Sequence, residues 1–132
     1  MIVPDATIVA GFIFPKDDLH SIARAVRQKD SDWHCPDLVF SEVRSVALKH
    51  RSKGAALESL IALCNLCAAS VSVYRLDNAT VLSAAVEGKL WAYDAEYVAL
   101  ARKLECKLVT TDRDVLKSFP GVAIDPQAFL KS

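Results

Sequence analysis

The sequence predicts a three-layer α/β/α sandwich with a central parallel sheet, formed by residues 1–132 as a single domain. Short apolar or β-branched runs alternate with longer segments of helical periodicity, and this order is typical of parallel strands covered by helices on both faces. The 132 residues, 52% of them hydrophobic, suffice for one buried core and are too few for two ordinary domains. Asp5 and Asp112 follow predicted strands, at the sheet edge where ligands bind in such folds.

Five short strands are expected from apolar or β-branched runs. Pro4 has no backbone N–H, so it must lie at the end of the first strand or where a missing donor does no harm. Pro36 is expected to stop the second strand. The predicted strands lie at residues 1–3, 33–35, 71–76, 107–110 and 122–124.

The segments between these strands carry apolar residues at the spacing of a helix. Asp37 is a suitable cap for the helix that contains Glu42 at its middle, Asp77 or Asn78 caps a later helix, and Gly88 ends that helix. The predicted ranges are 7–14 as a short helix or turn, a helix from Asp18, and helices at 37–49, 55–69, 77–87 and around 93–104, with Tyr93 and Tyr97 on one apolar face.

Charge and composition exclude several classes of protein. The chain has 16 Lys and Arg against 16 Asp and Glu, so no overall basic field attracts nucleic acid, and such binding must be local or carried by a metal. The first apolar run is interrupted by Asp5, well short of the roughly 20 residues of a membrane span, and it lacks a basic leader. We therefore expect a cytoplasmic protein that does not enter the membrane. The four cysteines are expected to be reduced packing residues, and the three histidines to lie at the surface or at caps.

Four carboxylates, Asp5, Glu42, Asp94 and Asp112, stand where strands or helices begin or end. Each alone has a structural explanation as a cap, a turn former or a solvated helix residue. If the fold gathers them, they cannot all stay ionised without raised pKa values or a cation, and a hard divalent ion such as Mg²⁺ or Mn²⁺ resolves the conflict. Because Mg²⁺ keeps several waters and often binds phosphate, a phosphodiester substrate and a metal-activated water are expected.

Four sequence segments around these acids resemble the PIN-domain ribonucleases, and within them the VapC-like toxins. The segments read VPDATIVAG, LVFSEV, YDAEYVALARKL and LVTTDRDVL. The resemblance implies a metal-dependent endoribonuclease with Asp5, Glu42, Asp94 and Asp112 as its acidic quartet. It further implies that the hydroxyl of Thr110 orders the last acid and its water, and that Asp114 assists or replaces Asp112. Members of this group commonly form homodimers and are silenced by a small antitoxin protein that lays a helix and an extended tail across the active-site groove.

Basic and aromatic residues offer weaker signals of RNA binding. Lys49 and Arg51 end the helix of Glu42 and either complement its negative end or hold RNA phosphates, and Arg113 follows Asp112 directly. The rings of Trp91 and Tyr93, like that of Trp33, are expected in the core or at an interface rather than as platforms for bases.

Two other classes of function stay open. A haloacid-dehalogenase-like phosphohydrolase also begins with an aspartate after a strand, but it needs a second aspartate two residues later, where this chain has Thr7. A non-catalytic module of the same fold would bind RNA or protein without turnover.

Overall fold

Five parallel strands form the centre of the computed structural model, which describes all of residues 1–132. Ladders join β1 to β4, β4 to β5, and β2 to β3, and a single parallel bridge between Ile2 and Trp33 joins the two sets. The strand order across the molecule is therefore β3–β2–β1–β4–β5. The strands are β1 (Ile2–Pro4), β2 (His34–Pro36), β3 (Ser72–Tyr74), β4 (Lys107–Val109) and β5 (Ala123–Ile124).

Pro4 explains why β1 and β2 meet at one bridge only. The N–H of Ile2 donates to the carbonyl of Asp32 over 3.0 Å. The next β1 donor on that side would be two residues further on, at Pro4, which has no N–H. The pairing therefore stops, and the Sγ of Cys35 donates to the carbonyl of Pro4 over 3.4 Å instead. Pro4 is thus the last residue of its strand, as the sequence predicts.

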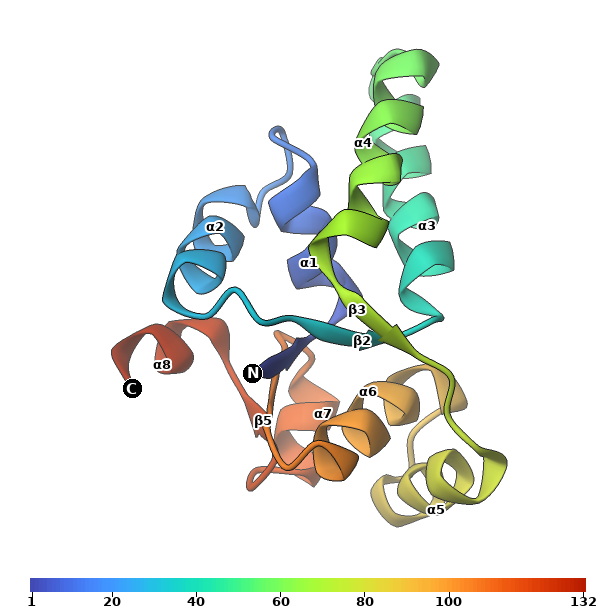
Figure 1. Cartoon of the computed structure of the whole chain (residues 1–132), viewed down its shortest axis with the longest axis vertical. Helices are drawn as coiled ribbons and strands as arrows, with labels where there is room; N and C mark the ends of the chain where they lie inside the picture. Colours follow the sequence, from blue (N-terminus) through green and yellow to red (C-terminus); the bar gives the residue numbers. More distant parts are fainter.

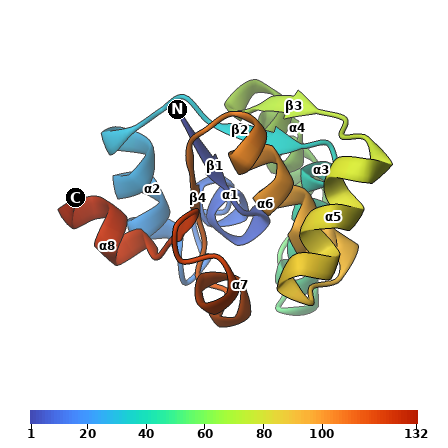
Figure 2. The same ribbon diagram turned by 90° about the horizontal axis from the view of Figure 1, so that it is seen from below.

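Helices cover both faces of the sheet, which confirms the predicted α/β sandwich. Figure 1 shows α1 to α4 on one side of the strands and α5 to α7 on the other, and the view from below in Figure 2 places α8 beside α2. No helix is both long and apolar enough to span a bilayer. The helices are α1 (Ala6–Ile13), α2 (His20–Lys29), α3 (Val39–Ser52), α4 (Leu57–Ser70), α5 (Asn78–Gly88), α6 (Ala92–Lys103), α7 (Arg113–Ser118) and α8 (Pro126–Lys131).

The core lies where α1 and α6 sandwich the central strands. Four core residues have at most 1% of their surface exposed: Val3 of β1, Ile8 of α1, Leu100 of α6 and Leu108 of β4. The α4 helix behaves differently, because only Leu60 and Cys67 of its 14 residues are buried. The centre of the fold is therefore closed, while most of α4 faces solvent.

Several details differ from the sequence-based prediction. Leu38, not Asp37, is the N-cap of α3, so Glu42 lies in the first turn of that helix rather than at its middle. The α5 helix ends one residue later than predicted, with Lys89 in the left-handed conformation at φ 53°. Two six-residue helices, α7 and α8, were not predicted, because they are too short to show a periodic pattern.

One histidine differs from the prediction, and the cysteines agree with it. His34 is buried rather than at the surface, with Nε2 2.7 Å from Asp32 and Nδ1 2.7 Å from the hydroxyl of Tyr74. Cys35 and Cys67 are buried, and Cys64 and Cys106 are partly buried; all four are free thiols, as predicted.

Candidate functional site

Asp5 lies at the junction of β1 and α1, in the middle of the sheet edge. Its N–H donates to the carbonyl of Val109 over 3.0 Å, which extends the pairing of β1 with β4 by one residue. Its Oδ1 caps α1 by accepting hydrogen bonds from the N–H groups of Thr7 and Ile8 at 3.0 and 3.1 Å, and from the Thr7 hydroxyl at 2.6 Å. The carboxylate is therefore fixed in position by its own helix.

Thr110 connects Asp5 to Asp112. The hydroxyl of Thr110, a buried residue directly after β4, donates to Oδ2 of Asp5 and accepts a 3.0 Å hydrogen bond from the N–H of Asp112. Asp112 in turn caps α7, with Oδ1 accepting from the N–H groups of Asp114 and Val115 at 2.9 and 3.2 Å. One threonine thus links the acids that follow β1 and β4.

Asp94 and Glu42 lie in the first turns of α6 and α3. The phenol of Tyr97, one turn further along α6 than Asp94, donates a 2.7 Å hydrogen bond to Oε1 of Glu42. Both carboxylates are partly buried. Because Tyr97 follows Asp94 at i+3, both project from the same side of α6, which brings Glu42 toward that side as well.

The pKa values of Asp94 and Glu42 respond to the charges of other acids of the quartet. Burial raises the pKa of Asp94 above its usual value, and the charges of Asp112, Asp5 and Asp114 raise it further. Burial also raises the pKa of Glu42, with smaller contributions from Asp5 and Asp94 that the hydrogen bond from Tyr97 opposes. The pKa of Asp5 is raised by burial, although the hydrogen bonds from Thr110 and Thr7 favour its charged form.

The donor set fits a hard cation that keeps part of its water shell. As positioned, no three Asp, Glu, His or Cys side chains lie close enough together to hold an ion by themselves. This geometry differs from that of a structural zinc site, which is closed by four protein ligands. Carboxylate oxygens without any sulfur or imidazole partner suit Mg²⁺ or Mn²⁺, and Mg²⁺ commonly binds through one or two carboxylates and several waters.

An open cleft of about 660 Å³ adjoins Asp94. It lies between the turn that joins α5 to α6 and the helix α7. Asp94 and Asp114 line it together with Lys89, Lys117 and Trp91. The cleft therefore exposes at least one acid of the quartet to a ligand.

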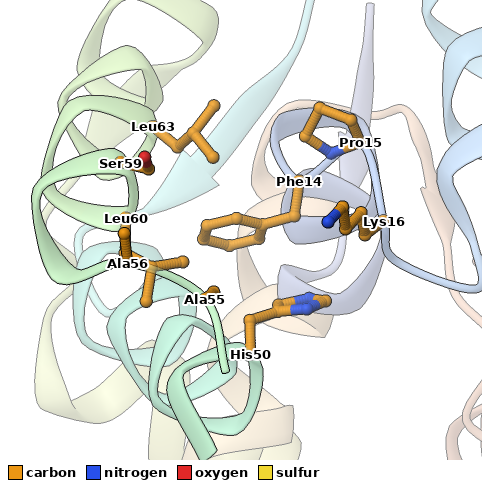
Figure 3. Close-up of a pocket in the computed structure, with 9 residues that line it drawn as sticks. All are labelled: Phe14, Pro15, Lys16, His50, Ala55, Ala56, Ser59, Leu60 and Leu63. Carbon is orange, nitrogen blue, oxygen red and sulfur yellow. The ribbon is translucent and has the colours of Figure 1, made fainter. Parts of the chain in front are cut away.

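A second cavity, of about 280 Å³, is apolar and lies away from the acids (Figure 3). It is lined by Phe14, directly after α1, by His50 near the end of α3, and by Leu60 and Leu63 of α4. Asp5 is at the opposite end of α1, about 12 Å along the helix axis. This cavity is therefore separate from the acidic site.

The predicted RNA-binding residues are divided between two places. Arg113 begins α7 beside Asp112 and is exposed, as is the supporting acid Asp114 that follows it. Lys49 and Arg51 lie in the last turn of α3, about 10 Å or more along the helix from Glu42. Arg51 donates to the carbonyl of Ala55 over 2.9 Å and so stabilises the turn into α4. The structure does not bring these two residues into the acidic site.

Sequence reasoning missed two groups that contact the acids, and it placed Tyr93 on the buried face of its helix, where the structure does not have it. Thr7 and Tyr97 donate to Asp5 and Glu42, and the spacing of Tyr97 three residues after Asp94 was a usable signal for a shared helix face. Trp91 and Tyr93 are neither in the core nor on the buried face of α6, since 81% and 64% of their surfaces are exposed. Trp33 is buried, as expected.

The fold and the site together define an α/β protein with carboxylates at the carboxyl ends of its parallel strands. The family model of the PIN domain matches residues 2–122, and the chain belongs to this family. Ribonuclease VapC3 of Pyrobaculum aerophilum is 32% identical over 129 residues, which cover 92% of this chain and 96% of that protein.

A solved structure supports the same fold. The crystal structure of PAE2754 from Pyrobaculum aerophilum superposes with a TM-score of 0.75 and covers 98% of this chain and 86% of that chain. Its sequence is 21% identical, so the likeness concerns the fold alone.

Proposed function

We propose that this protein is an endoribonuclease that depends on Mg²⁺ or Mn²⁺. The observation that carries the proposal is the mutual influence of Asp5, Glu42, Asp94 and Asp112, whose charges or hydrogen bonds reach one another across the carboxyl ends of β1 and β4. Membership of the PIN family and the similarity to a protein named ribonuclease VapC3 support the choice of RNA as the substrate.

Each acid has a distinct task in this proposal. Asp5, whose position is fixed by α1 and Thr110, and Asp94, which faces the open cleft, would hold the metal ion directly or through its waters. Thr110 orders Asp5 and Asp112, and Tyr97 orders Glu42. When bound, the ion would lower the pKa of a coordinated water and stabilise negative charge on the phosphate. Asp114, beside Asp94 in the cleft, assists Asp112.

A cleavage assay tests this function. The purified protein, freed of any bound partner, is incubated with total RNA and Mg²⁺ or Mn²⁺, and in parallel with EDTA. We expect cleavage that requires the divalent ion and that Asp5→Asn and Asp94→Asn abolish. Asparagine also caps helices well, so Asp5→Asn keeps α1 in place while it removes the charge.

Asp18→Asn is the matched control, because Asp18 is an exposed aspartate in the loop between α1 and α2. This variant should cleave like the wild type. Cleavage that persists in EDTA or in both site variants would contradict the proposal. A folded protein that binds RNA without cutting it would identify the non-catalytic alternative.

The geometry around Asp5 disfavours a dehalogenase-like phosphohydrolase. That mechanism uses Asp5 as the nucleophile and a second aspartate two residues later, where this chain has Thr7. Here Oδ1 accepts three hydrogen bonds from Thr7 and Ile8, and Oδ2 accepts the hydroxyl of Thr110. Thr7, at the position where the second aspartate is needed, directs its hydroxyl at Asp5.

We further propose that the protein is the toxin of a toxin–antitoxin pair and forms a homodimer in the cytoplasm. The similarity to ribonuclease VapC3 supports the toxin role. The exposed apolar side chains of α4, Leu57, Ile61 and Leu66, are 49–52% exposed and offer a surface for a second copy of the chain. The apolar cavity in Figure 3 would accept a side chain of the antitoxin helix.

Copurification tests both partners. If a short reading frame beside the gene encodes a DNA-binding domain with an amphipathic tail, the protein expressed with its product should elute as one complex, whose RNA cleavage is suppressed. The protein alone should sediment as a dimer, and Ile61→Asp should convert it to a monomer that still folds. A wild-type monomer at micromolar concentration would contradict the dimer.

A further inference from the structure

Trp91 is the most exposed large hydrophobic residue of the protein, and it stands at the cleft beside the acids. Its side chain is 81% exposed, whereas the only other tryptophan, Trp33, is 2% exposed. Trp91 is the N-cap of α6 and precedes Asp94 by three residues. Both residues line the same cleft of about 660 Å³. Large exposed aromatic surface beside a cleft is typical of a binding site, so we expect a ligand to cover the face of this indole.

The backbone that carries Trp91 is fixed to the rest of the fold. A Cβ on Gly88 would lie 2.2 Å from Cε2 of Phe119, so the end of α5 packs directly on the residue that follows α7. The hydroxyl of Ser118 donates to the carbonyl of Gly88 over 3.3 Å. The N–H of Leu90 donates to the carbonyl of Ala85 over 2.9 Å and closes the turn. The position of the backbone that carries the ring is therefore set before any ligand binds, which lowers the entropic cost of binding.

Charged groups of both signs surround the ring. Lys89 and Lys117 are exposed and line the cleft from opposite sides, one from the turn before α6 and one from α7. Asp94, in the first turn of α6, and Asp114, in the first turn of α7, line the same cleft. The cleft thus combines an aromatic face, two ammonium groups, Asp94 of the proposed metal site and Asp114.

We infer that Trp91 is a stacking platform for one unpaired base of the RNA, next to the phosphate that is cut. The inference rests on the proposed ribonuclease function and names the form of the substrate: a single-stranded segment with an exposed base. Aromatic rings beside a cationic groove bind single strands in this way, because every base has a face to stack. Lys89 and Lys117 then contact the phosphates on either side of the stacked nucleotide.

The composition of the cleft favours a nucleotide over a protein partner. Only Leu90 and Trp91 among its eight lining residues are hydrophobic. A tryptophan that anchors a protein interface usually enters a well-packed pocket that excludes water. Trp91 instead stands among charged groups, which suits a ligand that is flat and apolar on one part and anionic on the other.

The test measures RNA binding separately from cleavage. An unstructured oligoribonucleotide of about ten nucleotides is titrated into the protein in EDTA, with fluorescence anisotropy for affinity and tryptophan emission as a local signal. Because Trp33 is buried, the emission change on binding should come from Trp91. Trp91→Ala should weaken binding about 5- to 150-fold, which corresponds to the loss of one stacked base. Trp91→Phe should restore most of the affinity and lack the emission change.

Leu48→Ala is the matched control, since Leu48 is a 67% exposed apolar residue on α3, outside the residues that line the cleft. It should bind and cleave RNA like the wild type. With Mg²⁺ present, Trp91→Ala should raise KM more than it lowers kcat.

The outcomes separate this inference from the proposed function. If Trp91→Ala cleaves RNA and binds it as the wild type does, the stacking role of Trp91 is wrong. The proposed ribonuclease function is then unaffected. Unchanged RNA affinity with weakened dimerisation or antitoxin binding assigns Trp91 to a protein interface, and also overturns it. A wild type that neither binds nor cuts RNA ends both proposals.

Discussion

The phenol of Tyr97 donates a 2.7 Å hydrogen bond to Oε1 of Glu42, across 55 residues of sequence. Tyr97 is 4% exposed and belongs to the buried face of α6, so the rigid core holds the hydroxyl at this place. The bond opposes burial and the charges of Asp5 and Asp94, all of which raise the pKa of Glu42. Tyr97 therefore favours the ionised form of Glu42 and orients its carboxylate.

Tyr97→Phe should lower activity and make it more sensitive to acid. Without the hydroxyl the pKa of Glu42 rises further, so Glu42 becomes protonated at a higher pH as the solution is acidified. Groups that orient metal ligands typically contribute 10- to 100-fold to activity, and we expect a loss of about this size. The measurement is kcat/KM against pH, whose acidic limb should move to higher pH in the variant.

Tyr93→Phe is the control, because Tyr93 lies on the same helix and is 64% exposed. Its acidic limb should match that of the wild type. An unchanged pH profile in Tyr97→Phe would show that Glu42 does not take part in the reaction.

Thr110→Val should damage the site more than Thr110→Ser. Valine removes the donor to Asp5 and the acceptor for the N–H of Asp112, whereas serine keeps the hydroxyl. Because Thr110 is buried, the loss of these bonds should lower the free energy of unfolding by about 1–3 kcal/mol and activity by 10- to 100-fold. Urea denaturation and the cleavage assay measure the two effects. Equal activity in the two variants would exclude the proposed role of the hydroxyl.

The sequence reveals those features whose cause is local. Asp5 and Asp77 cap helices as their positions after strands or turns suggest, and Pro4 ends its strand because it lacks a donor. The four acids could be selected because each stands near such an end, and because the surrounding segments resemble a family.

Features that depend on distant parts of the chain could not be predicted. The bond between Tyr97 and Glu42 requires α6 to pack against the start of α3, which no local pattern reveals. The helical stripe placed Tyr93 on the buried face, yet that residue is exposed. Periodicity shows which residues share a face of a helix. It does not show how much of that face the neighbouring helices and strands cover.

Asp94→Asn should abolish cleavage without destabilising the metal-free protein. Burial and the charges of Asp112, Asp5 and Asp114 raise the pKa of Asp94, and no hydrogen bond offsets them. Its charge is therefore unfavourable in the folded state when no cation is bound, and asparagine removes it. Thermal unfolding in EDTA should give a Tm at or a few degrees above that of the wild type. Added Mg²⁺ should raise the Tm of the wild type and leave the variant nearly unchanged.

The pH dependence of this difference follows from the raised pKa. At low pH Asp94 is protonated in the folded and unfolded states alike, so it carries no penalty. As the pH rises above the ordinary value of 3.8, the unfolded chain ionises first and the wild type loses stability until the folded pKa is passed. The difference in Tm between Asp94→Asn and wild type in EDTA should therefore shift in favour of the variant as pH increases. A difference that shifts the other way would mean that the acids do not repel one another.

Gly88→Ala should destabilise the protein and impair RNA binding, while Gly121→Ala should do neither. The new methyl group at position 88 would lie 2.2 Å and 2.6 Å from two ring atoms of Phe119, so the turn that carries Trp91 must move away from α7. Overpacking of this kind costs about 1–3 kcal/mol. At Gly121 nothing lies within 4 Å of the added carbon. Urea denaturation and RNA titration of both variants provide the comparison, and equal RNA affinity in the two would show that binding does not depend on the position of this turn.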